Sequence, residues 1–256
     1  MSEKPLILAV ETSGRLGSVA IGRGGEILGA AAFSGPMRHS AELFPAISGL
    51  LERFSQKASE IEHIYISSGP GSFTGLRIAV TLAKAMHLAN AVKIVAVDTL
   101  DVIAANISDY LNEQNTETEL KNIATILDAK RSQFFVAAYK RQATTSAAYP
   151  EINRWEKILP DCIMTASQFL ERFAGKKEPI WLLGEGLVYH KDKFKGEGIW
   201  FLDEGYWTPK ASKVYLLGRE KASAGEFADA LALQPTYLQR PDVKEKPKTK
   251  GKPKAS

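Results

Sequence analysis

The stretch Ile64-Tyr-Ile-Ser-Ser-Gly-Pro-Gly-Ser-Phe-Thr-Gly-Leu-Arg-Ile-Ala79 decides the fold of this chain. In it an apolar, β-favouring run meets a glycine-rich turn, and a long alanine-rich helical pattern follows. Glycine lets the backbone turn sharply and approach another group closely, and Ser72 or Thr74 can cap the helix that begins here. N–H groups at a helix start bind anions, yet neither G-x-x-x-x-G-K-[ST] nor G-x-G-x-x-G is present. The stretch therefore predicts either an anion-binding turn or a tight corner between a strand and a helix.

The sequence on both sides of this stretch predicts three short antiparallel strands, followed by alternating helices and strands. Three antiparallel strands followed by alternating helices and strands are the order of a ribonuclease-H-like half. Pro45 is acceptable in the first of these helices only within its first turn. The predicted strands are 6–10, 18–23, 26–33, 64–67 and 94–97, and the predicted helices are 41–54 and 72–89.

The second half of the chain partly repeats this order. Its predicted strands are 123–127, 134–139, 152–158 and 180–183, and its predicted helices are 99–111, 165–173 and 211–224. We therefore expect an α/β protein with two related lobes of mixed sheets flanked by helices, covering residues 1–104 and 105–242. Lys, Pro and Gly dominate residues 243–256, which predicts a disordered tail.

Composition sets the broad class of the protein. The chain has 256 residues, of which 45% are hydrophobic and 24% charged, as in ordinary globular proteins. We expect no membrane span and no secretory signal, because no apolar run is long enough and Met-Ser-Glu-Lys-Pro leads directly into a strand. Cys162 is the single cysteine, so an internal disulfide and a cysteine-based zinc site are excluded. These features predict a cytoplasmic protein.

The positive charge is concentrated at the C-terminus. The formal net charge is +4. Residues 244–256 hold six lysines and one glutamate, so the rest of the chain is close to −1. The predicted lobes therefore carry no compositional sign of nucleic-acid binding.

Five stretches of the chain form a recognisable set of motifs: Leu8–Ser13, His39–Pro45, Ser68–Arg77, Val95–Leu100 and Gln234–Arg240. Together they resemble the TsaB (YeaZ) family, the smaller relative of the TsaD threonylcarbamoyl transferase. The resemblance implies an actin/Hsp70/sugar-kinase type of fold with two ribonuclease-H-like lobes. It also implies a role in making threonylcarbamoyladenosine in transfer RNA, beside the anticodon.

The same resemblance implies the partners of the chain. A TsaD-like transferase would form a heterodimer with it, a TsaE-like ATPase would join the larger complex, and the chain would form a homodimer when alone. No cofactor would be tightly bound, although ATP or ADP would be expected at the interface of the complex. Transfer RNA would be contacted indirectly or through the Lys-rich tail, for which a solubility role is the alternative.

One departure from the TsaD pattern argues that this chain is not the catalyst. In TsaD-like chains the strand matching Val95–Val97 runs into Asn-His-Leu-Glu-Gly-His, whose two histidines hold a metal. Thr99 and Ile103 occupy those positions here, and an isoleucine cannot coordinate a metal. Asp98 and Asp101 are best interpreted as a helix N-cap and a first-turn charge, with a Mg²⁺-binding pair as the alternative. We expect no catalytic residue and no metal ligand.

The helices at 41–54 and 72–89 carry more apolar and small residues than one buried face requires. Small residues allow another helix to approach closely, and the family resemblance implies that these two helices bind the TsaD-like partner. The residues predicted for this interface are Leu43, Ile47, Leu50, Leu51, Leu76, Ala79, Val80, Ala83 and Met86.

A further prediction concerns nucleotide or anion binding. Glu11 stands where sugar kinases place the aspartate that organises Mg²⁺ and nucleotide, although it could equally close a hairpin turn. A free-standing nucleotide-dependent phosphotransferase is therefore the alternative function, while a metallopeptidase would require ligands that the sequence lacks. The residues of this further prediction are Glu11, Thr12, Ser13, Gly69, Gly71, Ser72 and Gly75.

Overall fold

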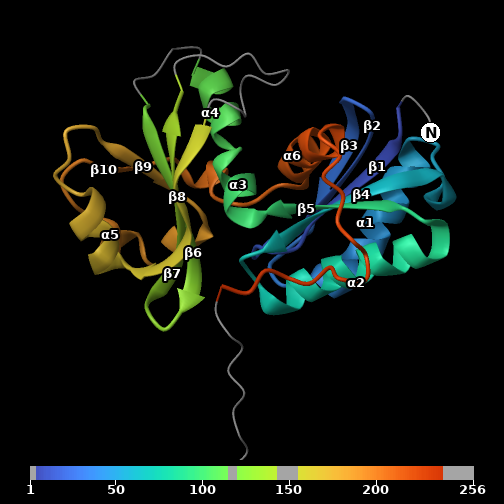
Figure 1. Ribbon diagram of the computed structural model, residues 1–256, viewed down its shortest axis with the longest axis horizontal. Helices are drawn as coiled ribbons and strands as arrows, with labels where there is room; N and C mark the ends of the chain where they lie inside the picture. The colour runs from blue at the N-terminus through green and yellow to red at the C-terminus, as the bar shows by residue number, and fades with distance from the viewer. Residues whose placement is uncertain (1–3, 115–119, 143–154, 239–256) are drawn as a thin grey trace, which may run out of the picture.

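The computed structural model describes residues 4–114, 120–142 and 155–238, which form two lobes side by side (Figure 1). Lobe 1 is built on a sheet with the strand order β3-β2-β1-β4-β5. Strands β1 to β3 are antiparallel neighbours, whereas β4 and β5 run parallel to β1. Their bounds are β1 Leu6–Glu11, β2 Ser18–Arg23, β3 Glu26–Ala32, β4 Ile61–Gly69 and β5 Lys93–Asp98.

Lobe 2 repeats this topology in a second sheet with the order β10-β9-β6-β7-β8. Strands β6 to β8 are antiparallel neighbours, and β9 and β10 continue in parallel on the other side of β6. The duplication confirms the predicted pair of ribonuclease-H-like lobes and the actin/Hsp70/sugar-kinase type of fold. The bounds are β6 Asn122–Lys130, β7 Gln133–Arg141, β8 Trp155–Thr165, β9 Ile180–Leu183 and β10 Ile199–Phe201.

Helices cover both faces of the lobe 1 sheet. The longest two, α1 and α2, pack on one face, and α6 packs on the other. In lobe 2, α5 packs on β8, while α3 contributes to the cores of both lobes. The helices are α1 His39–Arg53, α2 Phe73–Asn90, α3 Thr99–Ala104, α4 Ile107–Gln114, α5 Ala166–Phe173 and α6 Ala211–Ser223. Short 3₁₀ turns occur at Ala58–Glu60, Glu185–Leu187, Lys191–Phe194 and Glu204–Tyr206.

Strand β1 shows why this sheet needs helices on both sides. All six of its residues are buried. Leu6, Leu8 and Val10 point into the core beneath α1 and α2. Ile7 and Ala9 point into the core beneath α6. Successive side chains of a strand point to opposite faces, so a continuously apolar strand is stable only where both faces are covered.

The chain returns to lobe 1 after completing lobe 2, which corrects the predicted extent of the second lobe. Residues 105–242 were expected to form lobe 2, yet α6 packs on β1, β2 and β5 (Figure 1). Val214 and Tyr215 are fully buried in that core. The N–H of Ala228 then donates to the carbonyl of Ile94 (2.8 Å). The physical reason is that the second face of the lobe 1 sheet has no other helix of this length to cover it within residues 4–114, 120–142 and 155–238.

Some predicted elements differ locally from the structure. Pro45 lies in the second turn of α1, because the helix begins at His39 rather than at residue 41. The predicted helix 99–111 is divided into α3 and α4, and β8 continues to Thr165, which also caps α5. Residues 152–154, the tail 243–256 and the last two residues of the Gln234–Arg240 motif lie outside the described residues. No helix among the described residues has the length and apolar character needed to cross a bilayer.

Candidate functional site

The glycine-rich turn lies between β4 and α2 and begins the helix as predicted. Ser72 is the N-cap of α2, and its hydroxyl accepts a hydrogen bond from the N–H of Gly75 (3.3 Å). Gly69 has a φ of +121° and Gly71 a φ of +159°, a region of backbone conformation that favours glycine. The turn therefore needs its glycines for its own geometry.

The same turn packs against the residues that follow β1. The N–H of Ser72 donates to the carbonyl of Ser13 (2.8 Å), and the hydroxyl of Thr12 donates to the carbonyl of Gly75 (2.7 Å). A Cβ atom on Gly71 would lie 2.6 Å from the Ser13 carbonyl oxygen. The two segments are thus in direct backbone contact, and the glycines make that contact sterically possible.

Glu11 lies at the centre of this contact and is fully buried. Its carboxylate accepts from the N–H and the hydroxyl of Ser13 (both 2.5 Å), from the N–H of Gly14 (3.2 Å) and from the hydroxyl of Ser67. Burial raises the pKa of Glu11, and these hydrogen bonds partly oppose that shift. Of the two interpretations of Glu11, the closed turn is the one that the contacts support.

The seven residues predicted for nucleotide or anion binding therefore lie in one corner. Hydrogen bonds join five of them, Glu11, Thr12, Ser13, Ser72 and Gly75, whereas Gly69 faces the carbonyl of Thr236. The N–H groups of Ser13, Gly14, Ser72 and Gly75 all have acceptors within the chain. A phosphate at this place would have to displace those bonds. These contacts support the tight corner as a description of the stretch, and nucleotide or anion binding there stays a prediction.

Glu185 of lobe 2 contacts the β1–β2 turn of lobe 1. The sequence did not indicate this contact. Glu185 Oε2 accepts from the N–H of Arg15 (2.6 Å), and the side chain is buried. Burial raises the pKa of Glu185, whereas hydrogen bonds from the Arg15 backbone and the Thr208 side chain act to lower it. The Arg15 guanidinium also lies 4.8 Å from the ring centre of Tyr189. Because 170 positions separate Arg15 and Glu185, no local motif could have indicated this pair.

Asp98 and Asp101 do have the predicted local roles. Asp98 caps α3 by accepting from the N–H groups of Leu100 (2.7 Å) and Asp101 (3.3 Å). Both also face lobe 2, where Lys157 Nζ lies 2.7 Å from an oxygen of Asp101 and 2.7 Å from an oxygen of Asp161. Burial, a hydrogen bond shared with Asp161 and the charge of Asp101 raise the pKa of Asp98 to about 9. This network links β5 and α3 to β8, and Lys157 and Asp161 were not identified from the sequence.

The two positions that carry histidines in TsaD-like chains are closed to solvent. Thr99 and Ile103 are both fully buried, and Ile103 belongs to the lobe 2 core. Within the described ranges, no group of three or more His, Cys, Asp or Glu side chains is arranged to hold a metal ion.

The residues predicted for the partner interface require a correction. Eight of the nine are buried inside lobe 1, and Met86 is partly buried against the same core. Ala79 and Ala83 have no exposed surface at all. These side chains hold α1 and α2 against their own sheet, because the most apolar stripe of each helix faces inward. The eight buried side chains are unavailable to a partner.

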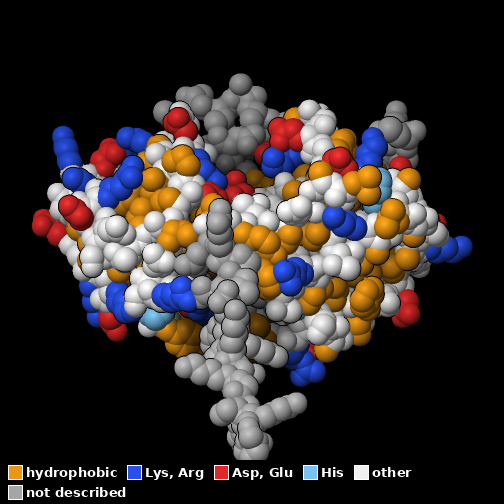
Figure 2. All heavy atoms as spheres, turned by 60° about the horizontal axis from the view of Figure 1, so that its bottom comes forward, with side chains coloured by type: hydrophobic (Ala, Val, Ile, Leu, Met, Phe, Trp, Pro, Cys, Tyr) orange, Lys and Arg blue, Asp and Glu red, His pale blue; other side chains and the backbone are white. Residues whose placement is uncertain are grey.

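A different set of residues forms an uncharged part of the exposed surface of the same two helices, which we call the helical face; the exposed charged residues Glu52 and Arg53 at the end of α1 and Arg77 in the second turn of α2 are not part of it. Leu88 is 77% exposed and Phe44 is 62% exposed, and Figure 2 shows hydrophobic side chains gathered on the right-hand half of the molecule, where α1 and α2 lie. A Cβ atom on Gly49 would meet nothing within 4 Å. None of these residues is charged. The helical face consists of Ala41, Phe44, Pro45, Ser48 and Gly49 of α1 and Thr81, Ala85 and Leu88 of α2.

The segment after α6 runs beside α2 and borders the helical face (Figure 1). The N–H of Thr236 donates to the carbonyl of Ser68 (2.7 Å). The Arg77 guanidinium lies 3.7 Å from the ring centre of Phe73 and donates to the hydroxyl of Tyr237 (3.3 Å). The C-terminal motif seen in the sequence thus meets the glycine-rich turn.

Comparisons with known proteins agree with this architecture. A family model described as "TsaD: tRNA N6-adenosine threonylcarbamoyltransferase" matches residues 36–185, more than half of the chain. The tRNA threonylcarbamoyladenosine biosynthesis protein TsaB of Bacillus subtilis is 28% identical over 243 residues, covering 94% of this chain and 96% of that protein. The Escherichia coli TsaB protein is 22% identical over 232 residues, covering 91% and 94%.

A solved structure shows the same fold. YeaZ from Pseudomonas aeruginosa superposes with a TM-score of 0.72 at 22% identity, covering 91% of this chain and all of that chain. A second Pseudomonas aeruginosa structure, an uncharacterized protein with similarity to peptidase YEAZ, has a TM-score of 0.74 at 21% identity and covers 92% and 100%. With the duplicated sheets, the glycine-rich turn against Thr12 and the match to the TsaD family model, this chain belongs to the TsaB (YeaZ) family.

Proposed function

We propose that this chain is a non-catalytic subunit in the synthesis of threonylcarbamoyladenosine in transfer RNA. In this proposal it binds a TsaD-like transferase through the helical face and keeps that transferase active. Its curated relatives are named as biosynthesis proteins for this modification. ATP or ADP at the subunit interface, a TsaE-like ATPase in the larger complex and a homodimer of the isolated chain are further parts of the proposal.

The observation that carries the proposal is that the exposed positions of α1 stay uncharged until the last turn of the helix, where Glu52 and Arg53 are exposed. Exposed helix surfaces of soluble proteins normally carry charged and polar residues. Here the exposed positions of α1 from Ser40 to Gly49 hold no charged side chain, and Phe44 projects from the middle of them. Contiguous exposed apolar surface marks an interaction site. The open surroundings of Gly49 would let a partner helix approach the backbone closely.

The non-catalytic role is supported by Thr99 and Ile103. Neither side chain is a metal ligand of useful strength, and both are buried. A chain that retained the frame of a transferase but filled the ligand positions with buried residues would depend on a partner for the chemistry.

The test is a pairing and transfer assay with the TsaD-like chain from the same cell. We expect Phe44→Asp and Leu88→Asp to abolish co-purification, because each would bury an unpaired charge in the interface. Both positions are exposed in the monomer, so thermal unfolding of the isolated variants should remain close to that of the parent. Threonylcarbamoyl transfer to transfer RNA by the mixture should fall in parallel.

Val188→Asp is the matched control, because Val188 is an exposed apolar residue in lobe 2 (42% exposed). It should pair normally and support full activity. Normal pairing of Phe44→Asp and Leu88→Asp would place the interface elsewhere. Transfer by this chain alone, at the rate of the mixture, would refute the non-catalytic role.

A further inference from the structure

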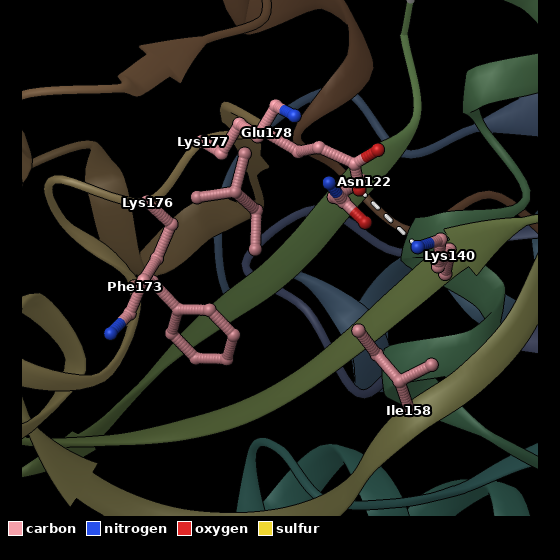
Figure 3. Close-up of a pocket in the computed structure, with 8 residues that line it drawn as sticks. Asn122, Lys140, Ile158, Phe173, Lys176, Lys177 and Glu178 are labelled. Carbon is pink, nitrogen blue, oxygen red and sulfur yellow. Dashed lines mark hydrogen bonds and ion pairs between the residues drawn. The ribbon is translucent and has the colours of Figure 1, made fainter.

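The outer side of lobe 2 has a hollow that the proposed function does not use (Figure 3). It lies where the end of α5 and the loop before β9 meet strands β6, β7 and β8. Its volume is about 480 Å³, which is within the range of small-molecule sites. The apolar side chains that line it are Ile158, Phe173 and Ile180, and Figure 3 shows Ile158 and Phe173 on opposite sides of the hollow.

Positive charge surrounds this apolar centre. Lys140, Lys176 and Lys177 line the hollow, and Lys121 stands beside it through its ion pair with Glu178 (3.6 Å). Glu178 also pairs with Lys140 (3.2 Å), and this hydrogen bond and charge lower the pKa of Glu178. The carboxylate therefore stays ionised and holds Lys140 at the rim. Four lysines against one glutamate leave a local excess of positive charge in a chain whose first 243 residues are close to neutral.

Two of these lysines are available to a ligand. Lys176 and Lys177 are exposed, and no carboxylate pairs with either of them in the part of the chain that the structure describes. Both follow closely after the end of α5, the helix whose last residue is Phe173. An aromatic ring beside two unpaired cations is a combination that suits a planar base attached to a phosphate.

We propose that this hollow binds an unpaired nucleotide of an RNA, with its base against Phe173 and Ile158 and its flanking phosphates near Lys176 and Lys177. The RNA assignment rests on the proposed function, in which the complex acts on transfer RNA. Lobe 2 would thereby supply a folded RNA contact, on the lobe that does not carry the helical face. The Lys-rich tail, which lies outside the described residues, is not required for it.

The test measures binding of a labelled transfer RNA transcript to the full-length chain by fluorescence anisotropy over a salt series. Lys176→Glu combined with Lys177→Glu should weaken binding about tenfold at low salt and reduce the slope of log affinity against log salt by roughly one to two units. Ile158→Ser and Phe173→Ala should each weaken binding several-fold and leave the slope unchanged, since the first removes apolar contact with the base and the second removes the stacking ring, and neither removes a charge. Phe173 also contacts Phe169 (4.7 Å between ring centres), so Ile158→Ser is the safer of the two.

The control is Lys4→Glu combined with Lys57→Glu, which makes the same change in charge at exposed positions of lobe 1. Equal weakening by this control would overturn the proposal, because only net charge would then matter. Adenosine monophosphate that bound as tightly as the transcript would also overturn it, in favour of a free nucleotide. Pairing with the TsaD-like chain is measured separately, so that a failed RNA site and a failed interface give different results.

Discussion

A Cβ atom placed on Gly75 would lie 1.7 Å from the carbonyl oxygen of Thr12. The helix start and the end of β1 therefore touch at a point where no side chain of any kind fits. Thr12 completes the contact by donating its hydroxyl hydrogen bond to the carbonyl of Gly75. Position 75 fixes the distance between the two segments that enclose Glu11.

Gly75→Ala should destabilise the protein by at least about 3 kcal/mol, since the backbone must move to accommodate the methyl group. Equilibrium unfolding in urea measures the loss. Gly49→Ala is the matched control: its Cβ would meet nothing, so the same substitution in an exposed helix should stabilise the monomer by roughly 0.5–1 kcal/mol. A small effect at Gly75 would mean that α2 can shift away from Thr12.

Two alanines two positions apart on α2 should respond in opposite ways to arginine. Ala83 is fully buried whereas Ala85 is exposed on the helical face. Ala83→Arg should leave the isolated chain unfolded or aggregated, because it places an unpaired charge in the core. Ala85→Arg should fold normally and fail to pair with the TsaD-like chain. Circular dichroism and co-purification distinguish the two results, and a folded Ala83→Arg would contradict the assignment of α2's inner face.

Glu11 should be replaceable by glutamine but not by alanine. Alanine would leave the donors of Ser13, Gly14 and Ser67 buried without an acceptor, at a cost of roughly 3 kcal/mol. Glutamine keeps one acceptor oxygen, and Ser67 can reverse its hydrogen bond to accept from the new amide group. Thermal unfolding at neutral pH should therefore place Glu11→Gln near the parent and Glu11→Ala well below it. Equal stabilities for the two variants would show that the hydrogen bonds contribute little.

The pH dependence of stability should contain a contribution from Asp98. Burial raises the pKa of Asp98 in the folded protein to about 9, whereas the pKa of an aspartate in the unfolded chain is about 4. Between these values the folded state holds a proton that the unfolded chain has released, so this group makes folding less favourable as the pH rises from about 4 to about 9.

Asp98→Asn should remove that contribution and flatten the curve, while asparagine preserves the helix cap. Urea unfolding across this pH range tests the expectation, with the exposed Asp203→Asn as the control for loss of a charge. A curve for Asp98→Asn parallel to that of the parent would rule out a raised pKa at this site.

The sequence was sufficient to predict the repeated lobes, because strand alternation, turns and the family motifs are local signals. The N-caps at Ser72, Asp98 and Thr165 followed from the same kind of signal. The residues predicted for the interface are buried instead, because apolar and small residues occur on both sides of α1 and α2. Composition does not show which side meets the sheet. Only the positions of the helices show that Ala83 faces inward and Phe44 outward.

The contacts between lobes were beyond the reach of sequence reasoning for another reason. Lys157 lies on a strand of lobe 2, yet it is surrounded by carboxylates from both lobes. The approach of Glu185 to Arg15 likewise depends on how the two sheets are oriented. Neither pair shares a motif or a spacing. The glycines of the turn, in contrast, are evident from the sequence. Their structural role depends on Thr12 and Ser13, which pack directly against them in the folded protein.

The return of the chain to lobe 1 has a consequence for synthesis on the ribosome. The sheet of lobe 1 is complete once β5 has emerged, but the face that carries Ile7 and Ala9 waits for α6. More than a hundred residues must be translated in between, including all five strands of lobe 2. A growing chain usually folds its domains in order from the N-terminus, whereas here the inserted lobe can be finished before the lobe that encloses it. We expect nascent chains that end before Ala211 to be held by chaperones and to be cleaved readily by proteases, and chains extended past Ser223 to become resistant.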